Sequence, residues 1–268
     1  MLTREVTAGT TSLSVTETGE GTSIVFLHAF PLDGRMWAPQ VDALAGHYQV
    51  VVPDLRGFGA AKEQVVEVAE LDLLADDLAR LLDDHGLDQV VLCGLSLGGY
   101  VSFAFARRHP SRLRGLVLAS TRATADDEGE AAARLEMAER VLAEGVGFLP
   151  EVMLPRLLGA TSRRDRPDLV ERVTKLLLEQ DPAAVAAAQR GMARRPDVTE
   201  ELAAVTVPVL VLSGTEDELI GPEDGRNLAA AFPDAKFALF EQAGHLLNLE
   251  RPDQVNEVLL DFAAPLWI

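Results

Sequence analysis

Basic residues are scarce in this sequence. The 268 residues include 24 lysines and arginines against 42 aspartates and glutamates, which gives a formal net charge of −18. A surplus of negative charge repels the phosphates of nucleic acids and the headgroups of anionic membranes. We therefore expect neither nucleic acid nor a membrane among the partners of the protein.

Cysteine is nearly absent as well. The single cysteine, Cys93, excludes an internal disulfide and any metal site built from several cysteines. It lies within an apolar, strand-like run, where cysteine usually packs as a small hydrophobic side chain. We expect a buried core thiol rather than a reactive one.

Long hydrophobic runs are missing too, although hydrophobic residues make up 48% of the chain. No apolar stretch approaches the roughly 20 residues that span a bilayer. The first five residues, Met1 to Glu5, lack the basic and then apolar regions of a signal peptide. The composition is typical of a soluble globular protein, and we expect a cytoplasmic location.

Short strand-like runs alternate with stretches of helical periodicity along most of the chain. These runs lie at residues 24–27, 49–53, 90–93, 113–120, 207–212 and 236–240. Continuous apolar runs are typical of strands buried on both faces of a parallel sheet, which are joined by right-handed helical crossovers. Segments 2–8 and 12–18 have the character of an antiparallel edge, with period-two alternation clearest in the second. The sequence thus predicts an α/β protein with a mostly parallel sheet.

Residues 122–202 break this alternation. They are rich in alanine, leucine, glutamate and arginine and are interrupted by glycine and proline, which predicts an all-helical insertion of about four helices. The insertion divides the sheet domain into residues 1–121 and 203–268. Its apolar stretch 146–158 could line a pocket, but packing onto the core is the expected use.

Arginine is frequent in and beside this insertion. The arginines there include Arg122, Arg134, Arg140, Arg156, Arg163 and Arg164. We expect them to be solvated surface residues. The alternative is that they serve a substrate that is a carboxylate-bearing lactone.

A Gly-x-Ser-x-Gly pattern, from Gly94 to Gly98, joins the run at 90–93 to a helix-like stretch. A serine on so sharp a turn must tolerate a strained backbone, and glycines on both sides let strand and helix approach closely. We interpret Ser96 as a nucleophile, with an ordinary glycine-rich turn as the alternative. The backbone N–H of Leu97 would then point at a reacting carbonyl oxygen.

A serine hydroxyl needs a neighbouring base, usually a histidine held by a carboxylate. Asp217 and His245 each follow a strand-like run, and the carboxyl ends of parallel strands meet at one edge of a sheet. We expect His245 to be the base and Asp217 to orient it. Three acidic residues of the same loop region are weaker alternatives: Glu216, Glu218 and Asp224.

The segment His28-Ala29-Phe30-Pro31 follows another predicted strand. An oxyanion formed by attack on a carbonyl needs hydrogen-bond donors already in place, each typically worth about 10²–10³ in turnover. We assign this role to the backbone N–H groups of Phe30 and Leu97. His28 is expected to brace this loop. The same role is the expected one for Asp54 and Arg56 in the loop that follows residues 49–53.

These motifs together resemble the α/β-hydrolase superfamily. Gly-Leu-Ser-Leu-Gly-Gly with Gly-His-Leu-Leu-Asn-Leu-Glu-Arg-Pro is similar to its esterase and lactonase branch, which includes 3-oxoadipate enol-lactonases and carboxylesterases. The resemblance implies an eight-stranded, mostly parallel sheet, a helical cap over the pocket, and no metal or organic cofactor. Ala29 stands where the family commonly has glycine. A serine nucleophile argues against the branches that use aspartate or cysteine.

The expected activity is hydrolysis of a carboxylic ester or lactone through an acyl-Ser96 intermediate. The same triad could serve carbon–carbon bond hydrolysis or perhydrolysis, and a hydrolase-like ligand receptor or signalling protein is an alternative of another class. The expected partner is a small-molecule ester or lactone. A monomer and a homodimer fit the sequence equally well.

Overall fold

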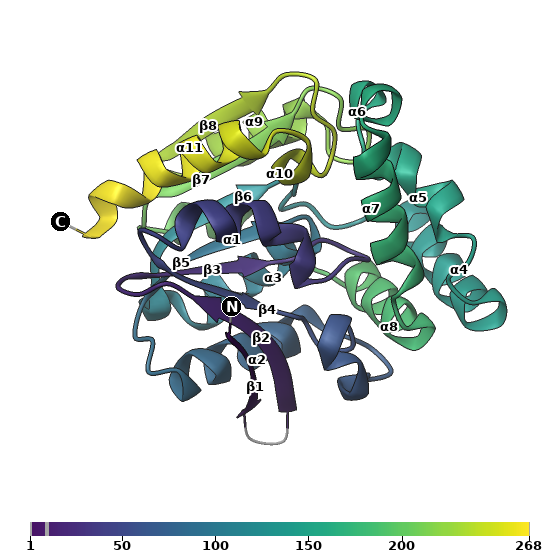
Figure 1. The fold of residues 1–268 in the computed structure, drawn as a ribbon, viewed down its shortest axis with the longest axis horizontal. Helices are drawn as coiled ribbons and strands as arrows, with labels where there is room; N and C mark the ends of the chain where they lie inside the picture. The colour runs from purple at the N-terminus through teal and green to yellow at the C-terminus, as the bar shows by residue number, and fades with distance from the viewer. Residues whose placement is uncertain (1, 9–10, 268) are drawn as a thin grey trace.

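The computed structural model of the chain describes residues 2–8 and 11–267. It contains an eight-stranded sheet in the order β1-β2-β4-β3-β5-β6-β7-β8 (Figure 1). The strands are β1 (Leu2–Ala8), β2 (Thr11–Thr18), β3 (Ser23–Leu27), β4 (Gln49–Pro53), β5 (Val90–Leu95), β6 (Leu113–Ala119), β7 (Val209–Gly214) and β8 (Ala235–Phe240). Only the pairs β1 with β2 and β2 with β4 are antiparallel. The predicted fold class, with its antiparallel edge, is confirmed.

The central strands are buried on both faces. Every residue of β3, β5 and β7 is buried, and in β6 the exposed residue is Arg114. Strands covered by helices on both faces gain hydrophobic stabilisation at each position, which is why their sequences read as unbroken apolar runs. Cys93 of β5 is fully buried, and this burial raises the pKa of its thiol. The prediction of a core thiol is confirmed.

Helices cover the two faces of the sheet. They are α1 (Ala38–Leu44), α2 (Leu71–Asp84), α3 (Leu97–Arg108), α9 (Pro222–Ala230) and α11 (Pro252–Ala263). Figure 1 shows α1 and α11 in front of the sheet and α3 behind it, and contacts link α1 to α11 and α2 to α3. Within the described ranges, no helix is both long and apolar enough to cross a membrane.

Between β6 and β7 the chain is described throughout and forms helices without a strand. These helices, called the inserted helices below, are α4 (Glu128–Glu144), α5 (Leu149–Leu157), α6 (Ala160–Asp165), α7 (Pro167–Leu178) and α8 (Pro182–Ala193), followed by the 3-10 helix η4 (Thr199–Ala204). About four helices were expected, and the short α6 is the extra one. Leu158 and Gly159 separate it from α5, and Arg166 alone separates it from α7, which begins at Pro167.

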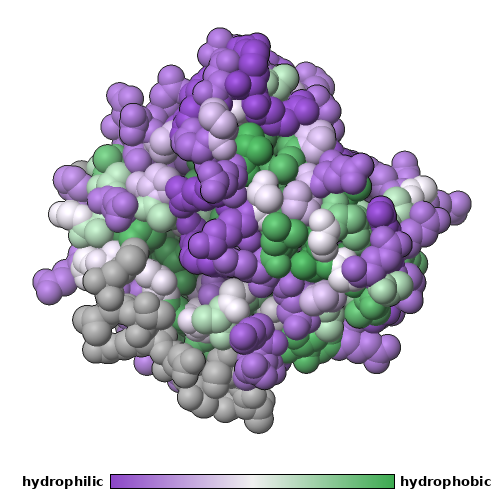
Figure 2. Space-filling view, turned by 45° about the vertical axis from the view of Figure 1, so that its right-hand side comes forward, coloured by the Kyte–Doolittle hydropathy of each residue, from purple (hydrophilic) through white to green (hydrophobic). Residues whose placement is uncertain are grey.

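The inserted helices form one side of the molecule, at the right of Figure 1. Figure 2 brings this side forward and shows a mostly hydrophilic surface with hydrophobic side chains in small, separate patches. Large hydrophobic side chains are exposed there at Leu135, Leu142 and Leu178. Scattered exposed side chains of this kind are ordinary on a protein surface.

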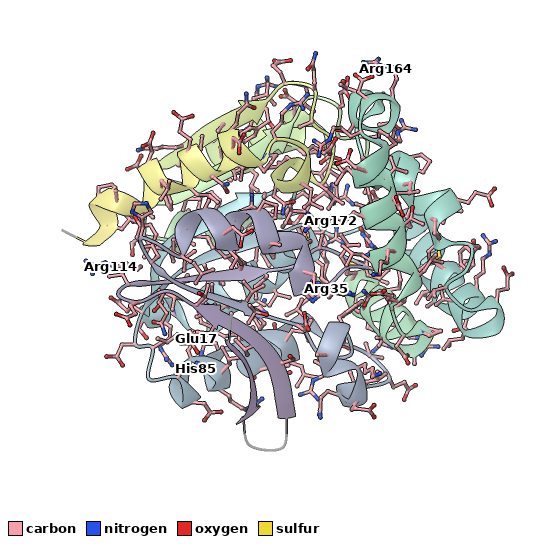
Figure 3. The ribbon with its side chains drawn as sticks, in the orientation of Figure 1. Glu17, Arg35, His85, Arg114, Arg164 and Arg172 are labelled. Carbon is pink, nitrogen blue, oxygen red and sulfur yellow. The ribbon has the colours of Figure 1, made fainter. Side chains whose placement is uncertain are left out.

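A polar junction fastens α7 to the sheet domain. Arg35, in the 3-10 helix η1 (Gly34–Trp37), pairs with Glu179 at 2.6 Å, and Arg172 of α7 donates to the carbonyl oxygen of Arg35 at 3.0 Å. Figure 3 shows Arg35 and Arg172 together where the two parts of the molecule meet. The buried carboxylate of Asp33 accepts hydrogen bonds from both Arg35 and Gln180.

Replacing Asp33 should weaken this junction. Asp33→Ala leaves one N–H of the buried Gln180 amide and part of the Arg35 guanidinium without an acceptor, so we expect the free energy of unfolding to fall by about 1–3 kcal/mol. Urea unfolding followed by circular dichroism measures the change. Arg164→Gln is the control, because Arg164 lies at the far tip of the inserted helices and forms an exposed pair with Asp165. Equal effects of the two substitutions would contradict the assigned role of Asp33.

Candidate active site

Ser96 occupies the sharp turn between β5 and α3. Its backbone has φ of 54° and ψ of −108°, a conformation that side-chain-bearing residues seldom adopt. The surroundings hold this strained backbone in place. The N–H of Ser96 donates to the carbonyl of Ala119 at 2.9 Å, and its carbonyl accepts from the N–H of Tyr100 at 3.0 Å and from the hydroxyl of Thr121 at 3.1 Å.

The two glycines beside Ser96 allow the close approach that the sequence predicts. A Cβ added to Gly94 would lie 2.2 Å from the carbonyl oxygen of Gly98, and one added to Gly98 would lie 2.3 Å from the carbonyl oxygen of Leu27. No side chain fits at either distance. The glycines therefore let α3 begin directly against β3 and β5, which places Ser96 at the carboxyl edge of the sheet.

His245 and Asp217 contact each other at this edge. Nδ1 of His245 lies 2.9 Å from Oδ2 and 3.1 Å from Oδ1 of Asp217, and both side chains are at most 1% exposed. The backbone N–H groups of Leu219 and Ile220 donate to Asp217 Oδ1 at 2.9 and 3.0 Å. Burial acts to raise the pKa of Asp217, but His245 and these N–H groups outweigh it and lower this pKa below its usual value.

The other acidic residues of the region have different neighbours. Glu216 accepts hydrogen bonds from the backbone and hydroxyl of Thr161, at 2.8 and 2.5 Å. Glu218 is exposed and lies 4.0 Å from Arg163. Asp224 accepts from the backbone of Gly221 at the start of α9. In the structure it is therefore Asp217 that contacts His245.

The loop after β3 lies beside Ser96. Phe30 lines the same cavity as Ser96, and Leu97 is the first residue of α3. The first N–H groups of a helix have no acceptor within the helix and favour nearby negative charge. The N–H of the preceding Ala29 is used differently, because it donates to the sulfur of Met36 at 3.2 Å.

Three polar residues brace the loops around the site, as predicted. The N–H of Leu55 donates to Nε2 of His28 at 3.0 Å, and burial lowers the pKa of His28, which keeps the ring neutral. Asp54 accepts from the backbone of Gly34 and Ala60, both at 2.8 Å. Arg56 forms two hydrogen bonds with the buried Asp77, at 2.9 Å each.

A cavity of about 260 Å³ opens over Ser96 and His245. Its apolar lining is Phe30, Ala133, Met137, Met153, Met192, Leu219 and Ile220. Its polar lining, apart from Ser96 and His245, is Tyr100, Arg122, Glu130, Arg134, Arg156 and Gln189. The structure thus brings together Ser96, His245 and Phe30 in one cavity, with Asp217 directly behind His245.

Two expectations about the lining have different outcomes. Of the apolar stretch 146–158, only Met153 and Arg156 line this cavity, whereas Leu149 and Leu157 are fully buried, so packing is its main use as expected. The expectation of solvated surface arginines is wrong for Arg122 and Arg134, which are half-buried and paired with Asp126, whereas Arg156 is exposed as expected. All three line the cavity: Arg134 lies on α4, Arg156 on α5, and Arg122 in the segment between β6 and α4.

Glu250 is a structural link that the sequence did not indicate. It ends the short helix α10 (Leu247–Glu250), and its carboxylate accepts from the N–H of Gly159 at 3.0 Å and of Gly244 at 2.9 Å. Only 1% of Glu250 is exposed, and burial raises the pKa of its carboxyl group. Glu250 thereby ties the segment between α5 and α6 to the loop that carries His245.

Other features of the described residues lie outside this constellation. A second cavity, of about 360 Å³, lies between α3, β6 and η4 and has an apolar lining that includes Phe103, Leu116 and Val205. No group of three or more histidine, cysteine, aspartate or glutamate side chains is arranged to hold a metal ion in the described part of the chain.

The lowered pKa of Asp217 predicts a pH-dependent contribution to stability. The ionised carboxylate stabilises the fold fully above the pKa of aspartate in the unfolded chain, about 3.9, and this stability is lost as pH falls through the lower folded-state pKa. The difference in free energy of unfolding between wild type and Asp217→Asn should therefore shrink between about pH 7 and about pH 3. Denaturant unfolding at several pH values measures it, and a difference independent of pH would contradict the assignment.

Comparisons with known proteins identify the family. A family model described as the alpha/beta hydrolase fold matches residues 22–252. The chain is 28% identical to 3-oxoadipate enol-lactonase 1 of Acinetobacter baylyi, over 94% of this chain and 92% of the relative.

Solved structures agree. A thermophilic esterase from Thermogutta terrifontis, solved with malate bound, has a TM-score of 0.93 and 40% identity, and the match covers 100% of this chain and 99% of that one. The enol-lactonase from Burkholderia xenovorans has a TM-score of 0.88 and 29% identity, with 95% and 97% covered. Because the family model spans most of the chain, the protein belongs to the α/β-hydrolase fold family.

Proposed function

We propose that the protein hydrolyses a carboxylic ester or lactone through an acyl intermediate on Ser96. The observation that carries this proposal is that Ser96 and His245 line one cavity while Asp217 contacts Nδ1 of His245 from behind. With Nδ1 protonated and bonded to Asp217, Nε2 of His245 is free to accept the proton of the Ser96 hydroxyl.

In the first half of the reaction, the Ser96 oxygen attacks the carbonyl carbon as His245 takes its proton. The carbonyl oxygen becomes an oxyanion, which the N–H groups of Phe30 and Leu97 stabilise. Collapse of this intermediate breaks the bond to the alcohol oxygen, and His245 protonates the leaving alcohol. For a lactone the alcohol stays attached to the acyl chain.

In the second half, His245 takes a proton from water, and the resulting nucleophile attacks the acyl carbon of acyl-Ser96. The second oxyanion collapses to release the carboxylic acid and restores the Ser96 hydroxyl with the proton held on His245. Asp217 stabilises the imidazolium in both halves, because its carboxylate is ionised at neutral pH.

The inserted helices act as a cap domain, residues 122–202, over a core built from residues 1–121 and 203–268. The support is the composition of the cavity wall: α4 contributes Met137, α5 contributes Met153 and α8 contributes Met192. Apolar side chains above the nucleophile exclude water from the acyl part of a substrate and strengthen the electrostatic interactions there.

The relatives support this class of activity. Esterase and enol-lactonase are the names of the structural neighbours that match at 40% and 29% identity. Both names describe attack on a carboxylic ester bond, which is the reaction that a serine, histidine and aspartate constellation performs.

Ser96→Ala should abolish the activity. We expect kcat for 4-nitrophenyl acetate or butyrate to fall by about 10⁴ or more, because the members of a triad act as a unit. Leu97→Ala is the matched control, since it alters the neighbouring side chain but keeps the backbone N–H, and it should retain most of the turnover. Unchanged activity in Ser96→Ala would overturn the proposal, and equal losses in the two variants would overturn the assignment of the Leu97 N–H.

A further inference from the structure

The wall of the Ser96 cavity carries more positive than negative charge. Three guanidinium groups, those of Arg122, Arg134 and Arg156, face it together with the carboxylate of Glu130. The whole chain has a net charge of −18. A positive lining is therefore a local feature that the overall composition of so acidic a protein does not produce. The partners of each cavity arginine show which charges are available to a ligand.

Two of the three arginines are fixed by carboxylates. Asp126, whose side chain is 1% exposed, pairs with Arg122 at 3.0 Å and with Arg134 at 2.5 Å. It also pairs with Arg195 at 2.6 Å, and Glu130 pairs with Arg122 at 2.6 Å. Burial acts to raise the pKa of Asp126, but Arg134 and Arg195 outweigh it and lower this pKa, so the carboxylate is ionised. In these direct ion pairs, three guanidinium groups share two carboxylates, so the donors of Arg122 and Arg134 are largely used within the protein.

Arg156 differs from the other two cavity arginines, because it has no carboxylate partner among the described residues. It lies near the end of α5, one turn after Met153, and its side chain is on the cavity wall and in contact with solvent. Within the described part of the chain, no hydrogen bond or ion pair is made by its guanidinium group. The paired arginines are held rigidly, whereas Arg156 keeps its full set of donors for a ligand.

We propose that the cavity selects esters or lactones that carry a carboxylate in addition to the bond that is cleaved, and that Arg156 binds this carboxylate. The inference rests on the proposed function and names its substrate class. A guanidinium group binds a carboxylate through two parallel hydrogen bonds, which fixes the orientation of the substrate as well as adding affinity. The methionine side chains of the wall reduce the screening of this interaction by water.

Isosteric substrate pairs separate charge from shape. Monoethyl succinate and ethyl 4-methylpentanoate place a carboxylate or an isopropyl group at the same position of the acyl part. O-acetylglycolate and isobutyl acetate make the same comparison on the alcohol part. Hydrolysis of all four is followed with a pH-stat, so that no chromogenic group occupies the cavity.

The variants are Arg156→Gln, Arg156→Glu and the control Arg140→Gln. Arg140 lies on α4, pairs with Glu144 at 3.0 Å and is not part of the cavity lining. In Arg156→Gln we expect kcat/KM for the anionic member of at least one pair to fall by about tenfold or more, mainly through KM, while the neutral members change less than about twofold. Arg156→Glu should lower the anionic rate further, and Arg140→Gln should leave every ratio unchanged.

Two results would overturn the proposal. One is an anionic-to-neutral ratio that is the same in wild type and Arg156→Gln for both pairs. The other is hydrolysis of the neutral esters by the wild type with no hydrolysis of either anionic ester. In both cases Ser96-dependent turnover of neutral esters would leave the proposed function standing, whereas failure of that function would appear as no Ser96-dependent turnover of any ester.

Discussion

The backbone of Ser96 is the constraint on which the rest of the site depends. A residue with a side chain at φ of 54° is strained by about 1–3 kcal/mol, and it keeps this conformation only when its surroundings leave no alternative. Here the end of β6 and the segment that follows it supply that restraint, since the carbonyl of Ala119 and the hydroxyl of Thr121 both bond to the Ser96 backbone. The same turn starts α3, so one local geometry sets the position of the nucleophile and of the helix N-terminus next to it.

The loops that carry His245 and Asp217 are tied to the inserted helices as well as to the sheet. The carbonyl of Leu157 accepts from the N–H of Leu246, Glu250 bridges Gly159 and Gly244, and Thr161 bonds to Glu216. Gly159 has no room for a Cβ, which would lie 2.9 Å from the backbone nitrogen of Gly244. Movement of the segment between α5 and α6 would therefore be transmitted directly to the residues on both sides of the His245–Asp217 contact.

The fold was predictable because its signals are local. A strand buried on both faces needs an unbroken apolar run, and β4 begins and ends where its run does, at Gln49 and Pro53. The chain order of Ser96, Asp217 and His245 was equally readable, since each residue follows a strand of a parallel sheet whose carboxyl ends converge. The contact between Asp217 and His245 then follows from the order of the strands.

The charged lining of the cavity was not predictable in the same way. Whether an arginine on an amphipathic helix faces solvent or a cavity depends on how that helix packs. Arg140 and Arg156 both lie in helix-like stretches of the sequence, and nothing in these stretches shows which of the two faces the cavity. Glu250 likewise lies in an ordinary polar position of the sequence, and its buried role appears only when Gly159 is brought to it from 91 residues away. Long-range packing of this kind leaves no pattern in a single sequence.

The most direct measurement of the central claim is to identify the residue that carries the acyl group. The protein is incubated with a phosphonate ester that reacts irreversibly with activated serines, and the modified peptide is located by mass spectrometry. The account predicts one adduct, on Ser96, formed at a rate that falls steeply in Asp217→Asn. Hydrolytic activity that persists after complete labelling of Ser96, or an adduct confined to another residue, would contradict it.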